Sequence, residues 1–147
     1  GELEVVVTVE GEQRVAEVRA QFLSVAIDTS QVVGGRWWSR EGRVDGSLGG
    51  DQVAPFDFER PALLRLARAL APAYLRVGGS DADMTRFEDA PPSAAPHRLT
   101  RRQWDSLNGF ARAAGLEVFF TVNAGPTARD GTGAFDAESA RALVRYS

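Results

Sequence analysis

The sequence contains no cysteine, no lysine and only one histidine, His97. Without cysteine, neither a disulfide nor a thiolate metal site can form, and a single histidine argues against a histidine-built metal centre within this chain. The sequence also lacks a basic-then-apolar leader and an uninterrupted apolar run of about 18 residues, so we expect no signal peptide and no membrane span in it. From the lack of cysteine and the single histidine we predict no metal in this chain, and we also expect no cofactor.

A strong positive charge is also absent. The net charge is -3, the isoelectric point is near 5.2, and 44% of the 147 residues are hydrophobic while 25% are charged. These proportions are typical of a globular domain that has an apolar core. Because nucleic-acid binding depends on clustered basic residues, we expect no nucleic acid as a partner.

The first twenty residues differ in pattern from the rest. Leu3, Val5, Val7 and Val9 alternate with other residues, Glu10-Gly11-Glu12 forms a turn signal, and a second valine-rich run follows. Period-two alternation on both sides of a glycine turn predicts a β-hairpin over residues 1–20.

From residue 21 onwards, apolar runs alternate with helical patterns. We expect buried strands at 21–27, 74–77 and 116–122. We expect helices from Pro61, from Thr100 and from Asp136. The first helix is supported by an apolar stripe of Leu63, Leu66, Ala67 and Leu70. The second has a capping box, Thr100 with Gln103, a stop at Gly115 and an apolar stripe of Trp104, Leu107, Ala111 and Ala114. The third is supported by Leu143 and Val144.

Two stretches interrupt this alternation. Residues 29–59 are rich in glycine and hold Trp37 and Trp38, and residues 88–97 form a proline-rich connector. Irregular stretches as long as the first are commonly functional or disordered. The two tryptophans could stack on sugar rings or simply anchor the loop onto the fold.

The order strand, helix, strand, helix, strand, helix predicts a parallel sheet with right-handed crossovers. Two architectures fit: a small doubly wound sheet, or the first three units of an eight-stranded (β/α)8 barrel. Three parallel strands alone would leave two open edges and one poorly covered face. We therefore expect this chain to be part of a larger fold, completed by a missing segment or by a second chain.

Polar or small residues end all three predicted strands: Asp28, then Gly78-Gly79-Ser80, then Asn123. Each taken alone is an ordinary turn former or helix cap. In parallel sheets, however, binding and chemistry gather at the carboxyl ends of the strands. Three such ends at one edge therefore indicate a site.

Arg76 lies inside the second predicted strand. A guanidinium is almost never buried without a partner, so an inward-facing Arg76 implies a carboxylate or a bound anion. The alternative is an outward-facing side chain whose head stays in water. Asp81 and Asp83 follow the glycine pair and could form a carboxylate pair with Asp28, although aspartates beside a glycine turn are usually capping or solvated.

The runs "FLSVAID", "PALLRLARALAPAYLRVGGSDAD" and "LEVFFTVNA" resemble the amino-terminal portion of heparanase and its bacterial relatives, the β-glucuronidase-type family 79 glycoside hydrolases. The resemblance extends over about residues 21–147 and is most specific over 70–80. It implies a (β/α)8 barrel over 21–147, here incomplete, and a β-sandwich to which residues 1–20 contribute strands. It also implies retaining hydrolysis of β-glucuronide linkages in heparan-sulfate-like or related glycans.

Site residues follow from the resemblance position by position. Asp28 matches an aspartate that binds sugar hydroxyls, and Arg76 matches an arginine that supports the nucleophilic carboxylate. The remaining substrate-binding positions are Gly78, Gly79, Ser80 and Asn123. The family's acid/base glutamate, in an Asn-Glu-Pro motif after strand four, and its nucleophilic glutamate are both absent, so we expect no catalytic carboxylate in this chain.

The expected partners are a glycan that contains glucuronic acid and the remainder of the barrel. Family resemblance favours a secreted or periplasmic protein. Two other functions fit the residues: a non-catalytic carbohydrate-binding fragment, and a small doubly wound domain that binds an anionic metabolite at the same strand ends.

Overall fold

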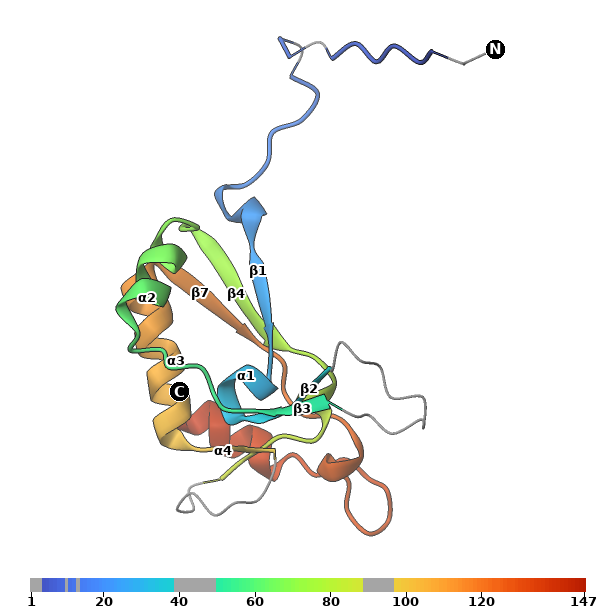
Figure 1. Cartoon of the computed structure of the whole chain (residues 1–147). Helices are drawn as coiled ribbons and strands as arrows, with labels where there is room; N and C mark the ends of the chain where they lie inside the picture. The colour runs from blue at the N-terminus through green and yellow to red at the C-terminus, as the bar shows by residue number, and fades with distance from the viewer. Residues whose placement is uncertain (1–3, 10, 13, 39–49, 89–96) are drawn as a thin grey trace.

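The structure is a computed structural model that describes residues 4–9, 11–12, 14–38, 50–88 and 97–147, with the backbone alone over 36–38 and 50–53. At its centre is a three-stranded parallel sheet in the order β1-β4-β7 (Figure 1). These strands are β1 (Val25–Asp28), β4 (Ala73–Gly78) and β7 (Leu116–Phe120). The predicted α/β class with parallel strands is confirmed.

Two smaller sheets and four helices complete the described elements. The antiparallel pair consists of β2 (Gly35–Trp38) and β3 (Gly50–Val53), and the second pair is parallel, β5 (Arg86–Phe87) with β6 (Arg98–Leu99). The helices are α1 (Ser30–Val33), α2 (Pro61–Arg68), α3 (Arg101–Ala114) and α4 (Glu138–Tyr146). Short 3-10 turns are η1 (Ala20–Leu23), η2 (Ser80–Asp83) and η3 (Pro126–Ala128).

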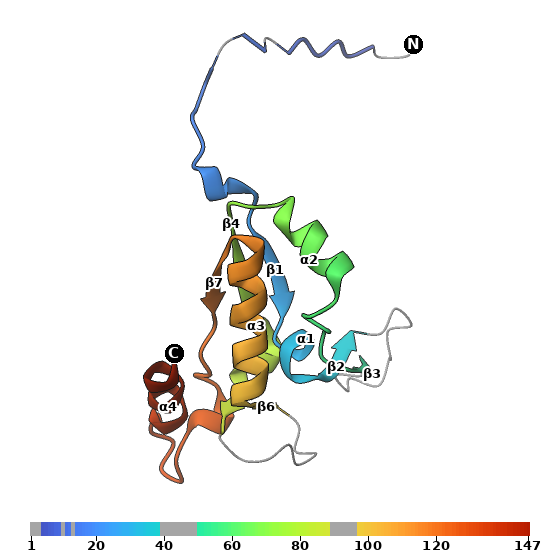
Figure 2. The same cartoon turned by 90° about the vertical axis from the view of Figure 1, so that its left-hand side faces the viewer.

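Helices α2 and α3 both cover one face of the sheet (Figure 2). On that face Leu75 and Val77 of β4 are 3% and 0% exposed, and Leu107 of α3 is 0% exposed. Alternation along a strand sends the intervening residues to the other face, where Tyr74 and Phe119 remain 42% and 62% exposed. The expectation of strands buried on both faces is therefore wrong for this part of the molecule, because the described residues supply helices to one face only.

Helix α3 follows its predicted sequence signals. Thr100 Oγ1 accepts the Gln103 N–H and the Gln103 side chain accepts the Thr100 N–H, which confirms the capping box. Gly115 ends the helix with a φ of 74°, a left-handed conformation that glycine adopts at little cost. The predicted stripe is buried, and Phe110 joins it.

Strand β1 is shorter than predicted. Residues 20–23 form η1 instead of strand, and Phe22 and Leu23 are 67% and 70% exposed. The hydroxyl of Ser24 accepts the Tyr74 N–H at 3.1 Å, so a side chain takes the place of the next hydrogen bond of the β1–β4 ladder. The β1–β4 pairing therefore begins at Val25 and does not include Gln21.

Helix α2 buries a different stripe from the one predicted. Ala67 is buried and Leu63 and Leu64 pack on the core, whereas Leu66 is 67% exposed and Leu70 lies beyond the helix end, 41% exposed. The short helix leans on α3, where the Arg68 Nε–H donates to the carbonyl of Ala113 at 3.0 Å. Packing against α3 thus determines which side of α2 is buried.

The amino-terminal residues show no strand pairing in the part that the structure describes. Residues 4–9 and 14–19 are extended, and Val5, Val9 and Val15 are 72%, 84% and 96% exposed (Figure 1). The hairpin and the separate 1–20 domain therefore stay predictions.

The two irregular stretches are only partly described. Helix α1, β2 and β3 occupy portions of 29–59, while residues 39–49 and 89–96 lie outside the described residues, as do the side chains of Trp37 and Trp38. None of the helices in the described ranges is long and apolar enough to cross a bilayer.

Candidate functional site

The carboxyl ends of the three central strands meet at one edge of the sheet, which we call the strand-end rim: Asp28, Gly78, Gly79, Ser80, Asp81 and Asn123. Asp28 pairs in register with Gly78, and Val77 pairs with Phe120. Beyond the ladder, the Thr29 N–H donates to the Gly78 carbonyl at 2.7 Å, and the Thr121 N–H donates to Val77 at 2.9 Å. The predicted convergence of the three polar strand ends is present in the structure.

Asp28 is half-buried, and the described residues engage only one of its oxygens. Its Oδ1 accepts the Ser30 N–H at 2.9 Å, which fixes the direction of the carboxylate at the start of α1. No described residue donates a hydrogen bond to Oδ2, which lies against Gly79. A carboxylate oriented by one oxygen can still accept hydroxyl donors with the other.

The glycine pair makes room for two charged side chains. A β-carbon at Gly78 would lie 2.7 Å from Arg76 Nη2 and 2.7 Å from Thr121 Oγ1. A β-carbon at Gly79 would collide with the Asp28 carboxylate, and the φ of +103° at Gly79 is itself strained for other residues. Gly79 is therefore required by its backbone conformation and by the Asp28 carboxylate, whereas the contacts at Gly78 are with the end of the Arg76 side chain and with Thr121 Oγ1.

Arg76 lies on the helix-free face of the sheet and is exposed. Its guanidinium folds over Gly78 beside Thr121, which directs it toward the rim. Among the described residues no carboxylate lies within ion-pair distance of it. The charged head is thus available to an anionic group that approaches this face.

Ser80 and Asp83 are exposed on η2, on the solvent side of the rim. The Asp83 carboxylate has no described hydrogen-bond partner, but its backbone carbonyl accepts the Thr127 hydroxyl at 3.3 Å. Asp83 is therefore not gathered with Asp28 into a close carboxylate pair by any described contact.

Asp81 lies deeper, between His97 and the turn that follows β1. Its Oδ1 is 3.8 Å from His97 Nδ1, and its side chain is 13% exposed. Burial raises the pKa of Asp81 above its ordinary value, the charge of His97 opposes this, and the charge of Asp28 adds to it. Asp81 and Asp28 are therefore electrostatically coupled across the rim.

Asn123, at the end of the third strand, is buried and well bonded. Its side-chain amide donates to the Thr85 carbonyl at 3.0 Å and to Thr127 Oγ1 at 2.8 Å, and its Oδ1 accepts the Gly125 N–H at 2.9 Å. These bonds tie the end of β7 to the segment that leads into β5. The amide oxygen accepts this one hydrogen bond from the described residues.

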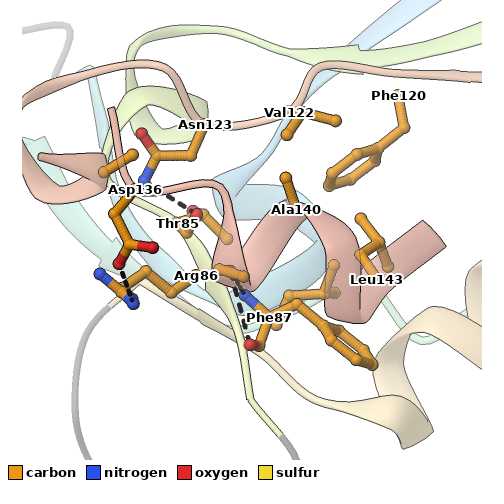
Figure 3. A pocket seen from close by; sticks show the side chains of 12 residues that line it. Thr85, Arg86, Phe87, Phe120, Val122, Asn123, Asp136, Ala140 and Leu143 are labelled. Carbon is orange, nitrogen blue, oxygen red and sulfur yellow. Dashed lines mark hydrogen bonds and ion pairs between the residues drawn. The ribbon is translucent and has the colours of Figure 1, made fainter. Parts of the chain in front are cut away.

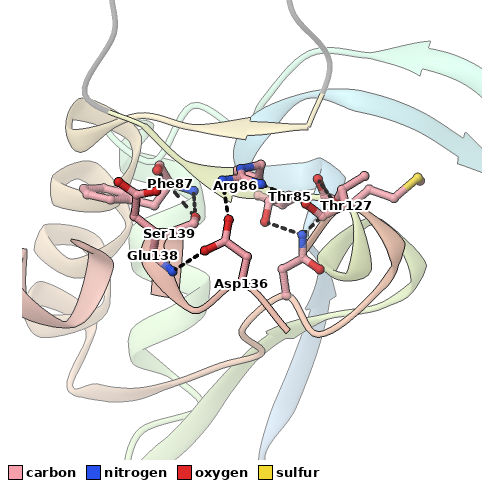
Figure 4. Close-up of polar contacts among 9 residues, drawn as sticks. Thr85, Arg86, Phe87, Thr127, Asp136, Glu138 and Ser139 are labelled. Atoms are coloured by element: carbon pink, nitrogen blue, oxygen red, sulfur yellow. Dashed lines mark hydrogen bonds and ion pairs between the residues drawn. The ribbon is translucent and has the colours of Figure 1, made fainter. Parts of the chain in front are cut away.

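A pocket lies beside Asn123, between β5, β7 and α4 (Figure 3). It is shallow and open to solvent, and Phe120, Val122 and Leu143 are among its apolar walls. Its polar side chains bond mainly to the protein: Arg86 pairs with Asp136 at 3.4 Å, and the Phe87 N–H donates to the Ser139 hydroxyl at 2.8 Å (Figure 4).

The predicted cap of the last helix is present in a shifted form. The Oδ1 of Asp136 accepts the Glu138 N–H at 3.0 Å, although the N-cap residue is Ala137 (Figure 4).

Over the described ranges no group of three or more histidine, aspartate and glutamate side chains is placed to bind a metal.

Sequence reasoning missed two features of this region. His97 drew notice only because it is the sole histidine, and nothing in the spacing connected it with Asp81. The Arg86–Asp136 ion pair joins residues 50 positions apart. No local pattern marks such long-range pairs, and only the tertiary fold brings them together.

Comparison with known proteins points to one group of relatives. No protein-family model matches the chain. The chain is 26% identical to heparanase-like protein 3 of Arabidopsis thaliana over 163 aligned positions, which cover 96% of this chain and 29% of the relative. It is also 26% identical to heparanase-like protein 1 of the same plant over 136 positions, 80% of this chain and 23% of that relative. The chain thus spans less than a third of the length of these curated relatives and is distantly similar to them.

Proposed function

We propose that this chain forms the first three βα units of the (β/α)8 barrel of a retaining glycoside hydrolase, and that the strand-end rim is part of its substrate cleft. The proposed substrate is a glycan with β-glucuronide linkages, of the heparan-sulfate-like or a related class. Residues 1–20 would contribute strands to an accessory β-sandwich. The observation that carries the proposal is the rim itself: an oriented carboxylate, a close-approach glycine pair and, beside them, a guanidinium that no carboxylate of the described residues pairs with.

Three further observations support it. The relatives are heparanase-like proteins, and this chain covers under a third of each. No described helix covers the sheet face opposite α2 and α3, and in a complete barrel this face would line the interior. The exposed apolar residues of that face, Tyr74 and Phe119, would then be buried inside the barrel.

In this proposal Asp28 binds the sugar and does not transfer the proton. Its Oδ1 is held by Ser30 N–H, so Oδ2 presents a fixed acceptor to ring hydroxyls. Gly78 and Gly79 leave space for the sugar beside the backbone, Ser80 offers an exposed hydroxyl, and Asn123 offers its remaining acceptor site.

Cleavage itself requires two further carboxyl groups. A retaining glycosidase needs one acid to protonate the leaving oxygen and one carboxylate to capture the anomeric carbon, about 5–5.5 Å apart. We propose that both come from polypeptide outside this chain, and that Arg76 faces the nucleophile. A guanidinium beside a carboxylate keeps it ionised and ready to attack.

The test uses the intact protein that carries this chain, assayed with an aryl β-glucuronide and the matching aryl β-glucoside. We expect turnover of the glucuronide with retained anomeric configuration, measured by NMR, and much weaker turnover of the uncharged sugar. Residues 1–147 alone should release no aryl group. Sugar binding without turnover by the intact protein would instead support the carbohydrate-binding alternative, and turnover by residues 1–147 alone would show that the catalytic carboxylates lie in this chain.

A further inference from the structure

We propose that Asp81 and His97 form a pH-sensitive brace that holds the turn Ser30–Gly35, and with it Asp28, in position while the imidazole carries its proton. The inference goes beyond the proposed function and does not depend on it. It starts from a place where three segments distant in sequence meet: the turn after β1, the 3-10 turn after β4, and the residue that precedes β6.

Contacts define how the brace touches the turn. On one side of Asp81, Oδ1 is 3.8 Å from His97 Nδ1. On the other side, a β-carbon at Gly35 would lie 3.0 Å from Asp81 Oδ2 and 3.4 Å from the β-carbon of Ser30. The Asp81 carboxylate therefore fills the space between His97 and the turn, and a β-carbon at position 35 would press against it.

Unused hydrogen-bonding atoms are concentrated at this place. Of the buried side-chain polar atoms in the described residues, those without a partner are Ser30 Oγ, Asp81 Oδ2 and His97 Nδ1. Ser30 itself is 0% exposed. Buried polar atoms normally have partners, and a cluster without them calls for a physical cause. A charged imidazole whose Nδ1 lies 3.8 Å from Oδ1 supplies a favourable charge beside the buried Asp81 carboxylate.

Electrostatics make the brace depend on that proton. The charged groups that face Asp81 are Asp28 from β1 and His97, while η3, which also packs on η2, contains no titratable residue. An ionised Asp81 is therefore opposed by burial and by Asp28 and is favoured by a charged His97. Histidine is the side chain that changes charge between about pH 5 and 8. A neutral imidazole leaves the buried carboxylate without this counter-charge.

The turn links the brace to Asp28. Ser30 N–H donates to Asp28 Oδ1 at 2.9 Å, and the Gly34 N–H donates back to the Ser30 carbonyl at 2.8 Å. A turn that loosens at Gly35 therefore releases the donor that orients Asp28. We expect the rim to be ordered under mildly acidic conditions and loosened under alkaline ones.

The experiment is hydrogen–deuterium exchange of the intact protein at about pH 5.5 and about pH 8, with rates corrected for intrinsic exchange and read on peptides that cover 29–38. In the parent, exchange of this segment should be several-fold faster at the higher pH. His97→Asn, chosen because His97 has a φ of 62° and asparagine tolerates that conformation, should exchange fast at both pH values. Asp81→Asn removes the buried charge and should abolish the pH dependence.

The matched control is Asp83→Asn on the same 3-10 turn, where the side chain is exposed and outside the cluster. It should behave like the parent. A parent without pH dependence, or an Asp81→Asn variant that keeps it, would overturn the brace. The KM for an aryl glucuronide at the two pH values gives a second reading that does rest on the proposed function. An intact protein with no turnover but with the expected exchange pattern would leave the brace standing and remove the proposed function.

Discussion

At one corner of the strand-end rim the Asn123 side chain makes three hydrogen bonds of 2.8 to 3.0 Å to the protein. At the other corner, around Asp28, three buried polar atoms have no partner among the described residues. A fully hydrogen-bonded polar network holds a structure rigid. Donors and acceptors without partners are the groups at which a bound proton or ligand can add the most stability. The Asn123 corner therefore supports the rim, and the Asp28 corner is the part that responds to what binds.

The largest effect is expected at the glycine that separates the two corners. Gly79→Ala places a β-carbon against the Asp28 carboxylate at a φ of +103°. Strained backbone of this kind typically costs about 1–3 kcal/mol, and the collision adds to it, so we expect about 3 kcal/mol less stability with loss of sugar binding. Chemical denaturation and a binding assay measure the two effects.

Gly133→Ala is the matched control for this change. Gly133 has a φ of +85° but nothing lies within 4 Å of a β-carbon built there. It should lose only about 1 kcal/mol, the cost of the backbone strain alone. Equal losses in the two variants would show that the Asp28 contact plays no part.

Asn123→Ala should produce the next largest effect, and it should appear in stability. The change leaves the Thr85 carbonyl and the Gly125 N–H without their bonds, and each buried unsatisfied group costs about 1–3 kcal/mol. We expect about 2 kcal/mol less stability by denaturant titration and a smaller rise in KM, because the amide oxygen is also a proposed acceptor for the sugar. Asn108→Ala, which removes one helix-surface bond to the Trp104 carbonyl, is the control. A large rise in KM without loss of stability would assign Asn123 to the ligand instead.

Asp28→Asn should act on binding instead of on stability. The amide oxygen can still accept the Ser30 N–H, so the fold is kept, while the acceptor charge offered to sugar hydroxyls is lost. We expect KM to rise about tenfold, equivalent to about 1.4 kcal/mol, with an unchanged shape of the pH–rate profile. Loss of one limb of that profile would identify Asp28 as a proton-transfer group.

The smallest effect, and one of opposite sign, is expected from Asp81→Asn. The pKa of Asp81 is raised in the folded state, mainly by burial, so the folded protein holds this proton more tightly than the unfolded chain does. Stability therefore falls as the pH rises from the unfolded value of 3.8 through the raised folded value. The variant should be slightly more stable than the parent near neutral pH and lose this advantage in acid. Thermal melts over a pH series test this, and an advantage that is equal at every pH would contradict it.

Sequence reasoning was sufficient where a signal is local. The capping box at Thr100, the stop at Gly115 and the strand that carries Arg76 were all predictable, because each depends on residues a few positions apart. The meeting of polar strand ends was also predictable, because parallel pairing brings carboxyl ends to one edge.

What could not be predicted depends on distant contacts. The rotation of α2 is set by α3, so the sequence alone placed Leu66 on the buried stripe when Leu64 belongs there. The early end of β1 follows from one hydroxyl, that of Ser24, which bonds to a residue 50 positions away. His97 reaches Asp81 only because β6 lies beside β5. None of these contacts has a signature within a short window.

The placement of β1 has a consequence for the order in which the molecule folds. Within the described sheet this four-residue strand pairs with β4 alone, and Val25 must find Leu75, fifty positions away. Helix α3 and β7 follow each other directly through Gly115 and close their contacts at short range. Because loop closure delays distant pairings, we expect α3 and β7 to form their contacts first, β4 to pair with β7 afterwards, and β1, which needs β4 as its partner, to dock last. Asp28 would then reach its place last, so that competence to bind marks a chain whose folding is complete.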